Sequence, residues 1–217
     1  MAIIKEHDFV EIEYTGRIKE DNSIFDTTEE KIAKDEGLFE KEHEYGPAII
    51  CIGEDNILKA LDEQIKGKET GKEYTFEINS ESAFGRKNAK LLQMVPLNKF
   101  RQQNINPVPG LQLNIDGVFG VVKTVSGGRC YVDFNHPLAG KDLVYNVKIK
   151  RVVDDDKEKL KSMLDIHLHL HDAEIEIKEG AAEISSKHEL PEEAQEEFRK
   201  IVEKAIPAVK KITFIKK

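Results

Sequence analysis

The sequence predicts an α+β protein built mainly from antiparallel strands. Three stretches, at 9–18, 73–78 and 143–152, alternate between apolar and polar residues with the period of a half-buried strand. One helical pattern, around residues 57–65, interrupts the strands of the first part of the chain. From residue 153 the pattern changes to helix, strand, strand, helix and strand. Together these observations predict three domains, and the strand at 143–152 belongs with the first of them.

Composition limits the classes of function. The 217 residues are 39% hydrophobic, which is enough to build cores, and 34% charged, with a formal net charge of −8. A negative balance argues against a general nucleic-acid binder, because phosphate binding requires clustered Lys and Arg. No apolar run approaches the about 18 residues of a membrane span. The first residues lack a signal-peptide pattern, and Cys51 and Cys130 form no CxxC motif, so we expect a cytoplasmic protein with reduced thiols.

The first domain is predicted as a sheet with one short helix. In the strand at 9–18, one face carries the apolar side chains of Val10, Ile12 and Tyr14. Residues 24–26 resume an extended segment after a turn, residues 29–46 form a charged surface excursion, and residues 48–52 form a short apolar strand. The helix is indicated by apolar residues at helical spacing, followed by a glycine at the expected C-terminal position: Ile57, Leu58, Leu61, Ile65 and Gly67.

The stretch VDFNHPLAGKDLVYNV, at 132–147, is a strand that stops and then starts again. The His136 loop in its middle fits either a catalytic loop or a junction between two domains. Hairpin signals at Asp116-Gly117 and at Ser126-Gly127-Gly128 indicate a small β-rich unit just before it. An inserted unit is tolerated when its two ends lie close together. We therefore predict that residues 86–137 are inserted into a host domain made of 1–85 and 138–152.

Residues 153–217 are predicted as a third domain with the order α-β-β-α-β. Acidic residues at 154–156 suit a helix N-terminus, and Pro191 begins a second helix. Strands are predicted at 166–170, 173–178 and 211–215. The pattern resembles that of BON-type modules. Formation of a homodimer is one role that we consider for this domain.

No nucleophile elbow, phosphate loop or zinc motif occurs in the chain. Five short motifs nevertheless occur in a familiar order: Tyr14-Thr15-Gly16, Phe25-Asp26-Thr27, Ile57-Leu58, Ala83-Phe84-Gly85, and NHPLAGKDL from residue 135. In this order they resemble the FKBP-type peptidyl-prolyl isomerases, in particular the SlyD-like and archaeal long-chain members. The resemblance covers residues 8–152. It implies an antiparallel half-barrel around one helix, interrupted by an insert-in-flap domain.

The resemblance also implies a prolyl pocket between sheet and helix. Carried over position by position, its residues are Tyr14, Phe25, Asp26, Ile57, Leu58, Leu61, Phe84 and Tyr145. Taken alone, most of these residues fit an ordinary core equally well. Asp26 is the exception, because an acid in an apolar stretch needs a hydrogen-bond partner or exposure. Rotation about an X-Pro bond breaks no bond and moves no proton, so we expect neither a cofactor nor a metal.

Two positions depart from the family pattern. Leu61 stands where many members have Trp, and Phe84 stands where many have Tyr. The missing hydroxyl removes one hydrogen bond to a bound carbonyl, a loss of about 0.5–1.5 kcal/mol. We therefore expect weaker binding of tacrolimus-like ligands, and isomerase activity that is reduced but present.

The insert contains an apolar string with two alternative roles. Its members are Leu91, Leu92, Met94, Val95, Leu97 and Phe100. They fit either the small core of the insert or a surface that binds unfolded chains, since Met adapts to varied partners. Resemblance to SlyD-like proteins favours binding, with unfolded or partly folded proteins that contain X-Pro bonds as partners. The rival interpretation is a holdase chaperone whose prolyl pocket is vestigial.

Three histidines raise the question of a metal. His167, His169 and His171 would share one face of the strand predicted at 166–170 and just beyond. Two neighbouring imidazoles on such a face could reach one ion, which would make a nickel or zinc metallochaperone the third interpretation. We favour a solvated strand face instead, and predict no metal site.

Overall fold

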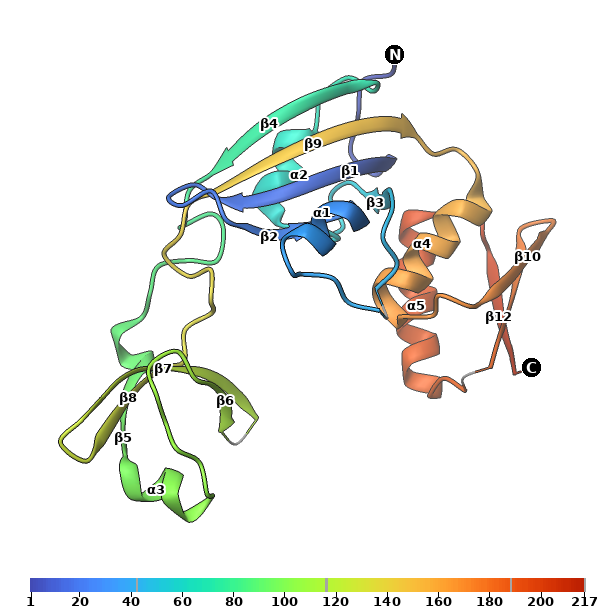
Figure 1. The fold of residues 1–217 in the computed structure, drawn as a ribbon. Coiled ribbons are helices and arrows are strands. Elements are labelled where there is room, and N and C mark those ends of the chain that lie inside the picture. The colour runs from blue at the N-terminus through green and yellow to red at the C-terminus, as the bar shows by residue number, and fades with distance from the viewer. Residues whose placement is uncertain (42, 116, 188, 217) are drawn as a thin grey trace. The chain divides into compact units, whose positions relative to one another are not determined.

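A computed structural model describes the chain (Figure 1). The described residues are 1–41, 43–115, 117–187 and 189–216. They form two compact units, the first made of residues 1–78 with 143–217 and the second of residues 79–142. The turn residue Asp116 lies outside the described residues. Both units combine helices with antiparallel strands, which confirms the predicted α+β class.

Five strands form an antiparallel sheet in the first unit. They are β1 (Phe9–Ile18), β2 (Ile24–Thr27), β3 (Ala48–Cys51), β4 (Lys72–Ile78) and β9 (Leu143–Val152). The order is β2-β1-β9-β4, and β3 also pairs with β1. The alternation predicted for β1, β4 and β9 is confirmed, since each buries every second side chain along most of its length. Strand β9 therefore lies between β1 and β4, although it is separated from both in the sequence.

Two short helices accompany this sheet. Helix α2 (Lys59–Ile65) packs against β4 and buries Leu61 and Ile65, and Figure 1 shows it beneath the arched sheet. Helix α1 (Glu30–Asp35) lies in the stretch that we expected to be a charged surface excursion, and the sequence did not predict a helix there. Ala33 of α1 is completely buried, while the charged residues of the helix are exposed. Two adjacent apolar residues among charged neighbours give no helical period that could be recognised.

The remaining elements of the first unit follow β9. They are α4 (Asp156–Leu168), β10 (Glu174–Lys178), β11 (Ala181–Ser186), α5 (Glu192–Ala205) and β12 (Lys211–Lys216). Strand β11 pairs antiparallel with β10 and parallel with β12. One hydrophobic core joins these elements to the first sheet, because it contains Phe9 of β1 and Cys51 of β3 together with Leu160, Leu164 and other residues of α4 and α5.

The strand predicted at 166–170 was wrong, because α4 continues to Leu168. Leu160 and Leu164 are buried one turn apart, and Leu168 continues the same stripe against the core. His169 adopts a left-handed conformation with φ of 53°, and its N–H donates to the Leu164 carbonyl, which ends the helix. The short alternation of apolar residues here was the end of a helical stripe. The histidines therefore do not share a strand face.

The second unit is a small sheet with a helical turn. Its elements are η1 (Ala89–Leu91), β5 (Leu92–Pro96), α3 (Leu97–Gln102), β6 (Gln112–Ile115), β7 (Val118–Ser126) and β8 (Arg129–Asp133). The strand order is β5-β8-β7-β6, so β5 and β6 are the edges. Phe100 and Val122 belong to its core. The two chain ends of the unit meet, since the Gly140 N–H donates to the Gly85 carbonyl over 2.7 Å.

Candidate functional site

Three strands bring an aromatic cluster together in the first unit. The backbone register places Gly16 of β1 opposite Asp26 of β2 on one side and opposite Tyr145 of β9 on the other. A Cβ atom on Gly16 would lie 2.7 Å from Cζ of Phe25 and 3.0 Å from Cε1 of Tyr145. Those distances are too short for any larger residue unless a ring moves. The absence of a side chain at Gly16 is therefore what lets the two rings approach this part of the sheet.

The rings of this cluster pack edge to face. The centroids of Phe25 and Tyr145 are 5.7 Å apart with an interplanar angle of 88°. The rings of Tyr14 and Tyr145 are 6.0 Å apart and tilted by 56°. Tyr145 is buried, whereas Tyr14 and Phe25 are half-buried. Aromatic pairs of this kind stabilise a fold by more than the burial of their apolar area alone. The cluster is therefore a fixed apolar surface that also carries the two tyrosine hydroxyls.

Asp26 places a carboxylate against this cluster. The Tyr14 hydroxyl donates a hydrogen bond of 2.9 Å to Oδ2 of Asp26. Burial raises the pKa of Asp26 above its usual value, although the Tyr14 hydrogen bond and the nearby His43 act in the opposite direction. Burial, followed by the charge of Asp26, raises the pKa of Tyr14. The Tyr14 hydroxyl therefore stays protonated and acts as a donor near neutral pH.

The other proposed pocket residues lie in two places. Ile57 and Leu58 are half-buried at the end of the loop before α2, and Leu61 is buried within that helix. Phe84 belongs to the second unit, where its ring stacks on His136 at 4.3 Å with an interplanar angle of 2°. His136, which the sequence suggested as a possible catalytic loop residue, is thus a ring partner of Phe84.

Sequence reasoning missed a second group of aromatic residues near Asp26. The rings of Phe39 and Tyr45 stack at 5.5 Å, and His43 meets Tyr45 edge-on at 4.8 Å. The charge of His43 also lowers the pKa of Asp26, in opposition to burial. The available signal was the presence of aromatic residues in an otherwise charged stretch.

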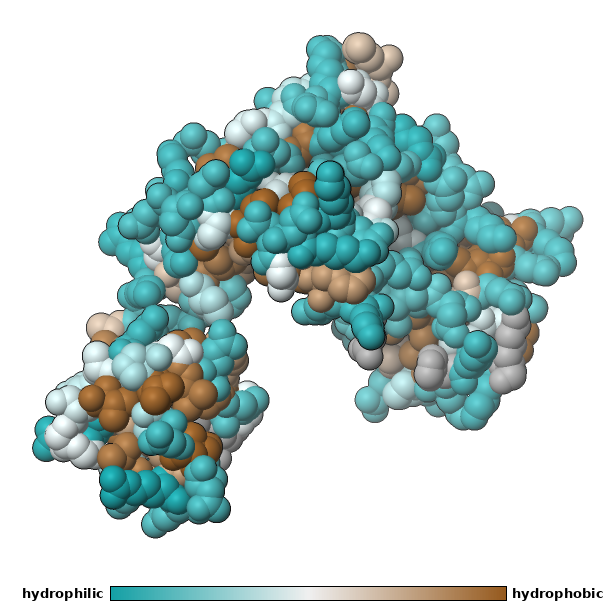
Figure 2. All heavy atoms as spheres, in the orientation of Figure 1, coloured by the Kyte–Doolittle hydropathy of each residue, from teal (hydrophilic) through white to brown (hydrophobic). Residues whose placement is uncertain are grey.

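The six apolar insert residues divide into two sets. Leu91, Leu92 and Met94 are exposed, and Met94 has 49% of its surface open to solvent. Val95, Leu97 and Phe100 pack in the core of the second unit. Figure 2 shows hydrophobic side chains on the face of this unit that is turned to the viewer. Exposed apolar residues that the sequence analysis did not identify add to the first set: Val118, Phe119 and Tyr131.

A surface pocket in the second unit lies beside two of these residues, Leu92 and Tyr131. Charged and amide side chains also line it: Lys87, Asn88, Lys123, Asp133 and Asn135. The side chain of Asn135 donates to the Asn88 carbonyl, which joins the two chain segments that enter and leave the unit. The pocket therefore offers a partner both apolar and polar groups.

The three histidines lie at and just after the C-terminal end of α4. His167 is half-buried on the helix, and burial lowers its pKa. His169 ends α4, and Nδ1 of His171 lies 3.4 Å from Oδ1 of Asp165. Across the residues that the structure describes, no three His, Cys, Asp or Glu side chains are grouped as metal ligands would be.

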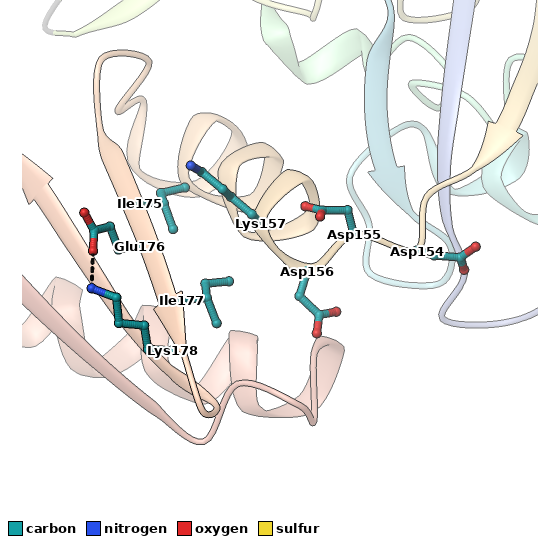
Figure 3. Close-up of a pocket in the computed structure, with 8 residues that line it drawn as sticks. All are labelled: Asp154, Asp155, Asp156, Lys157, Ile175, Glu176, Ile177 and Lys178. Carbon is teal, nitrogen blue, oxygen red and sulfur yellow. Dashed lines mark hydrogen bonds and ion pairs between the residues drawn. The ribbon is translucent and has the colours of Figure 1, made fainter.

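Figure 3 shows a further pocket at the start of α4, lined by residues 154–157 and 175–178. Several of its polar side chains are used within the fold. Oδ1 of Asp155 accepts from the Glu158 N–H at 2.8 Å and caps the helix, and Glu176 pairs with Lys178 at 2.7 Å. Asp155 thus has a structural role at the start of α4. None of the helices in the described part of the chain combines the length and apolar character needed to cross a membrane.

Comparisons with known proteins agree with this geometry. The profile of the family described as "FKBP26, IF domain" matches residues 93–138. A short-type peptidyl-prolyl cis-trans isomerase of Methanocaldococcus jannaschii is 29% identical over 156 residues, which cover 72% of this chain and 98% of the relative. The FKBP-type isomerase SlyD of Vibrio cholerae is 30% identical over 125 residues, 56% of this chain and 59% of the relative.

A third relative establishes the family. The probable FKBP-type 16 kDa peptidyl-prolyl cis-trans isomerase of Pseudomonas fluorescens is 34% identical over 108 residues. The match covers 48% of this chain and 71% of that protein. Identity at this level, over most of a known isomerase, accompanies the ordered motifs at Tyr14, Phe25 and Phe84. The chain therefore belongs to the FKBP-type peptidyl-prolyl cis-trans isomerases.

Proposed function

We propose that the chain isomerises X-Pro bonds at the cluster formed by Tyr14, Phe25, Asp26 and Tyr145. The observation that carries this proposal is the pair of rings packed against a bare Gly16, with Tyr14 beside Tyr145 and hydrogen-bonded to the Asp26 carboxylate. Family resemblance adds the remaining members of the proposed pocket: Ile57, Leu58, Leu61 and Phe84. The same resemblance suggests that the sheet of the first unit acts as a half-barrel around α2.

The chemistry suits such an apolar surface. Rotation about the X-Pro bond must overcome the loss of amide resonance, a barrier of about 18–20 kcal/mol. The twisted amide has less charge separation than the planar amide, so an environment with little water favours it. A single oriented polar group is enough to hold the substrate. The Tyr14–Asp26 pair is suited to that role, because its hydrogen bond fixes both side chains at 2.9 Å.

We further propose that the second unit captures unfolded chains for this site. Leu91, Leu92 and Met94 expose apolar surface, and Tyr131 lies beside Leu92 at the pocket described above. Leu92 and Met94 belong to β5, which is an edge strand with unpaired backbone groups along one side. An extended segment of a client can pair with such an edge while its side chains contact the apolar residues. Capture raises the local concentration of client at the prolyl site.

Two assays separate the two activities. We expect the protein to accelerate a refolding reaction limited by proline isomerisation and to isomerise a short X-Pro peptide. Asp26→Ala and Tyr14→Ala should lower both activities while leaving the fold intact, whereas Phe84→Tyr should maintain or raise them. Asp154→Ala, at an exposed position on the first unit, serves as a control. A wild-type protein that is inert in both assays but prevents aggregation would support the holdase interpretation.

Removal of the insert tests the capture step. The backbones of Gly85 and Gly140 are hydrogen-bonded to each other where the chain enters and leaves the insert. A short Gly/Ser loop in place of residues 86–137 should therefore join the host segments. Isomerisation of a small peptide should survive. Catalysis of protein refolding should fall on the order of tenfold, the effect of losing about 1.4 kcal/mol of capture free energy. Equal activity of both forms on protein clients would contradict the capture proposal.

We propose cytoplasmic partners of one kind, unfolded or partly folded proteins that contain X-Pro bonds, and neither nucleic acid nor membrane. Self-association through residues 153–217 is a separate proposal. It is supported by the strands β10 and β12, which are the two edges of their sheet, and by Ile215, which is exposed on β12. Sedimentation of the wild type and of Ile215→Asp at several concentrations tests it, since a single monomeric species throughout would contradict it.

A further inference from the structure

The C-terminal elements of the first unit pack directly on the strand that leads toward the proposed site. Helix α4 packs against β3, and the common core includes Phe9, Cys51 and Leu160. The Val153 N–H also donates to the Phe9 carbonyl over 2.7 Å. Burial raises the pKa of the Cys51 thiol to about 12, with contributions from neighbouring acids. Residues 153–217 are therefore built onto the outside of β1 and β3 rather than joined by a flexible linker.

Strand β3 continues into a closely bonded loop, residues 52–58. The Cys51 N–H donates to Oδ1 of Asn56 at 2.8 Å, and the Gly53 N–H donates to Oδ2 of Asp62 at 2.8 Å. Gly53 and Asp55 both adopt positive φ angles, of 90° and 52°. The loop ends at Ile57 and Leu58, which the family resemblance places in the prolyl pocket. Any shift of the loop backbone would therefore move these two side chains.

Glu54, in the middle of the loop, connects it to α5. Its side chain is only 13% exposed, and its Oε2 atom accepts a hydrogen bond of 3.0 Å from Nζ of Lys204. Oε1 lies 2.8 Å from the same nitrogen and 3.2 Å from Nδ1 of His7. The hydrogen bond with Glu54 raises the pKa of Lys204. The contact joins residues that are 150 positions apart in the sequence.

We infer that Lys204 is a positioning residue for the prolyl site, acting through Glu54 on the loop at 52–58. Pairs between fully exposed charges contribute little. Here the carboxylate is mostly buried, so removing Lys204 would leave a desolvated charge with His7 as its remaining close partner, which is costly. The loop would then relax toward solvent. This inference rests on the proposed function, and it gives residues 153–217 a role in the catalytic half of the protein.

The full-length chain with single substitutions tests this inference. Lys204→Met removes the charge and keeps the apolar stem, Lys204→Arg should restore the pair, and Lys200→Met changes an exposed lysine on the same helix. Amide hydrogen exchange of residues 52–58 should become faster by roughly three- to tenfold in Lys204→Met, as expected for a lost pair within one network. It should stay at the wild-type rate in Lys200→Met and return to it in Lys204→Arg.

Kinetics on a short X-Pro peptide provide the second readout. In Lys204→Met we expect KM to rise by roughly the same factor with kcat little changed, because the loop contacts the substrate in both the ground state and the transition state. Unchanged exchange and unchanged KM in Lys204→Met would overturn the inference while the proposed function stands. A wild-type protein without isomerase activity would overturn the proposed function, and with it the catalytic role of Lys204. The exchange rates would then still decide whether Lys204 holds the loop.

Discussion

At the scale of single residues, Gly16 is a position where a small change should have a large effect. Gly16→Ala places a Cβ atom 2.7 Å from Phe25 and 3.0 Å from Tyr145. Overpacking of this kind costs about 1–3 kcal/mol. We expect a lower free energy of unfolding, measured in urea, together with loss of peptide isomerisation. The double variant Gly16→Ala/Phe25→Ala should be less destabilised than the sum of its two single changes, because removing the ring makes room for the methyl group.

Asp26 gives a pH-dependent prediction. Its folded-state pKa is raised above 3.8 by burial, so its contribution to stability is fully present below 3.8 and is lost as the pH rises through the folded-state pKa. Asp26→Asn removes this titration and keeps an acceptor for Tyr14. The free energy of unfolding of Asp26→Asn, relative to wild type, should therefore increase from acid to neutral pH and then level off, while activity falls. Asp154→Asn, at an exposed position, should show no such trend.

At the scale of elements, the long alternating strands could be predicted, whereas short segments could not. The alternation in β1, β4 and β9 could be recognised because each strand has one buried and one solvated face. Strand β11 was missed, since Ala and Ser give no alternation in hydrophobicity strong enough to notice. The end of α4 was misassigned as a strand, because five residues are too few to distinguish the two-residue period of a strand from the end of a helical stripe. Short segments therefore depend on tertiary packing that sequence patterns do not contain.

The ordered motifs predicted which residues form the site, but not how those residues contact one another. The motifs named Tyr14, Asp26 and Tyr145, but the hydrogen bond between Tyr14 and Asp26 and the crowding at Gly16 depend on strand register. The contact between Glu54 and Lys204 joins distant segments and leaves no local signature. The sequence also left two alternatives for the six apolar residues of the insert, a place in its core or on a binding surface. Only the packing in the structure shows which of them are buried and which face solvent.

Strand β5 carries the element-scale prediction. Leu92 and Met94 are exposed on this edge strand, whereas Phe100 is buried in the core nearby. Leu92→Ser/Met94→Ser should leave the second unit folded and lower its suppression of client aggregation and its refolding catalysis. Val108→Ser removes an exposed apolar residue of the same unit outside β5 and serves as the matched control. If the double variant protects clients as well as wild type does, β5 is not the capture surface.

At the scale of the whole molecule, the two compact units predict two unfolding transitions. Leu160→Ala should cost about 2–5 kcal/mol in the core that joins α4 to β1 and β3. Phe100→Ala should cost about 3–5 kcal/mol in the core of the second unit. Hydrogen exchange resolved by segment should show each variant opening its own unit and leaving the other at the wild-type rate. A single transition shifted equally by both changes would mean that the units unfold together.

The position of β9 has a consequence for synthesis of the chain on the ribosome. Strands β1 and β4 have no direct pairing with each other, and β9 lies between them. The insert is translated after β4 and before β9, so β4 has no strand partner and one edge of β1 stays open until residue 152 has been added. At roughly 5–20 residues per second, the interval from residue 78 to residue 152 lasts roughly 4–15 s. During that interval the nascent catalytic half is itself an unfinished sheet with open edges, whereas the insert has all of its strands before β9 begins.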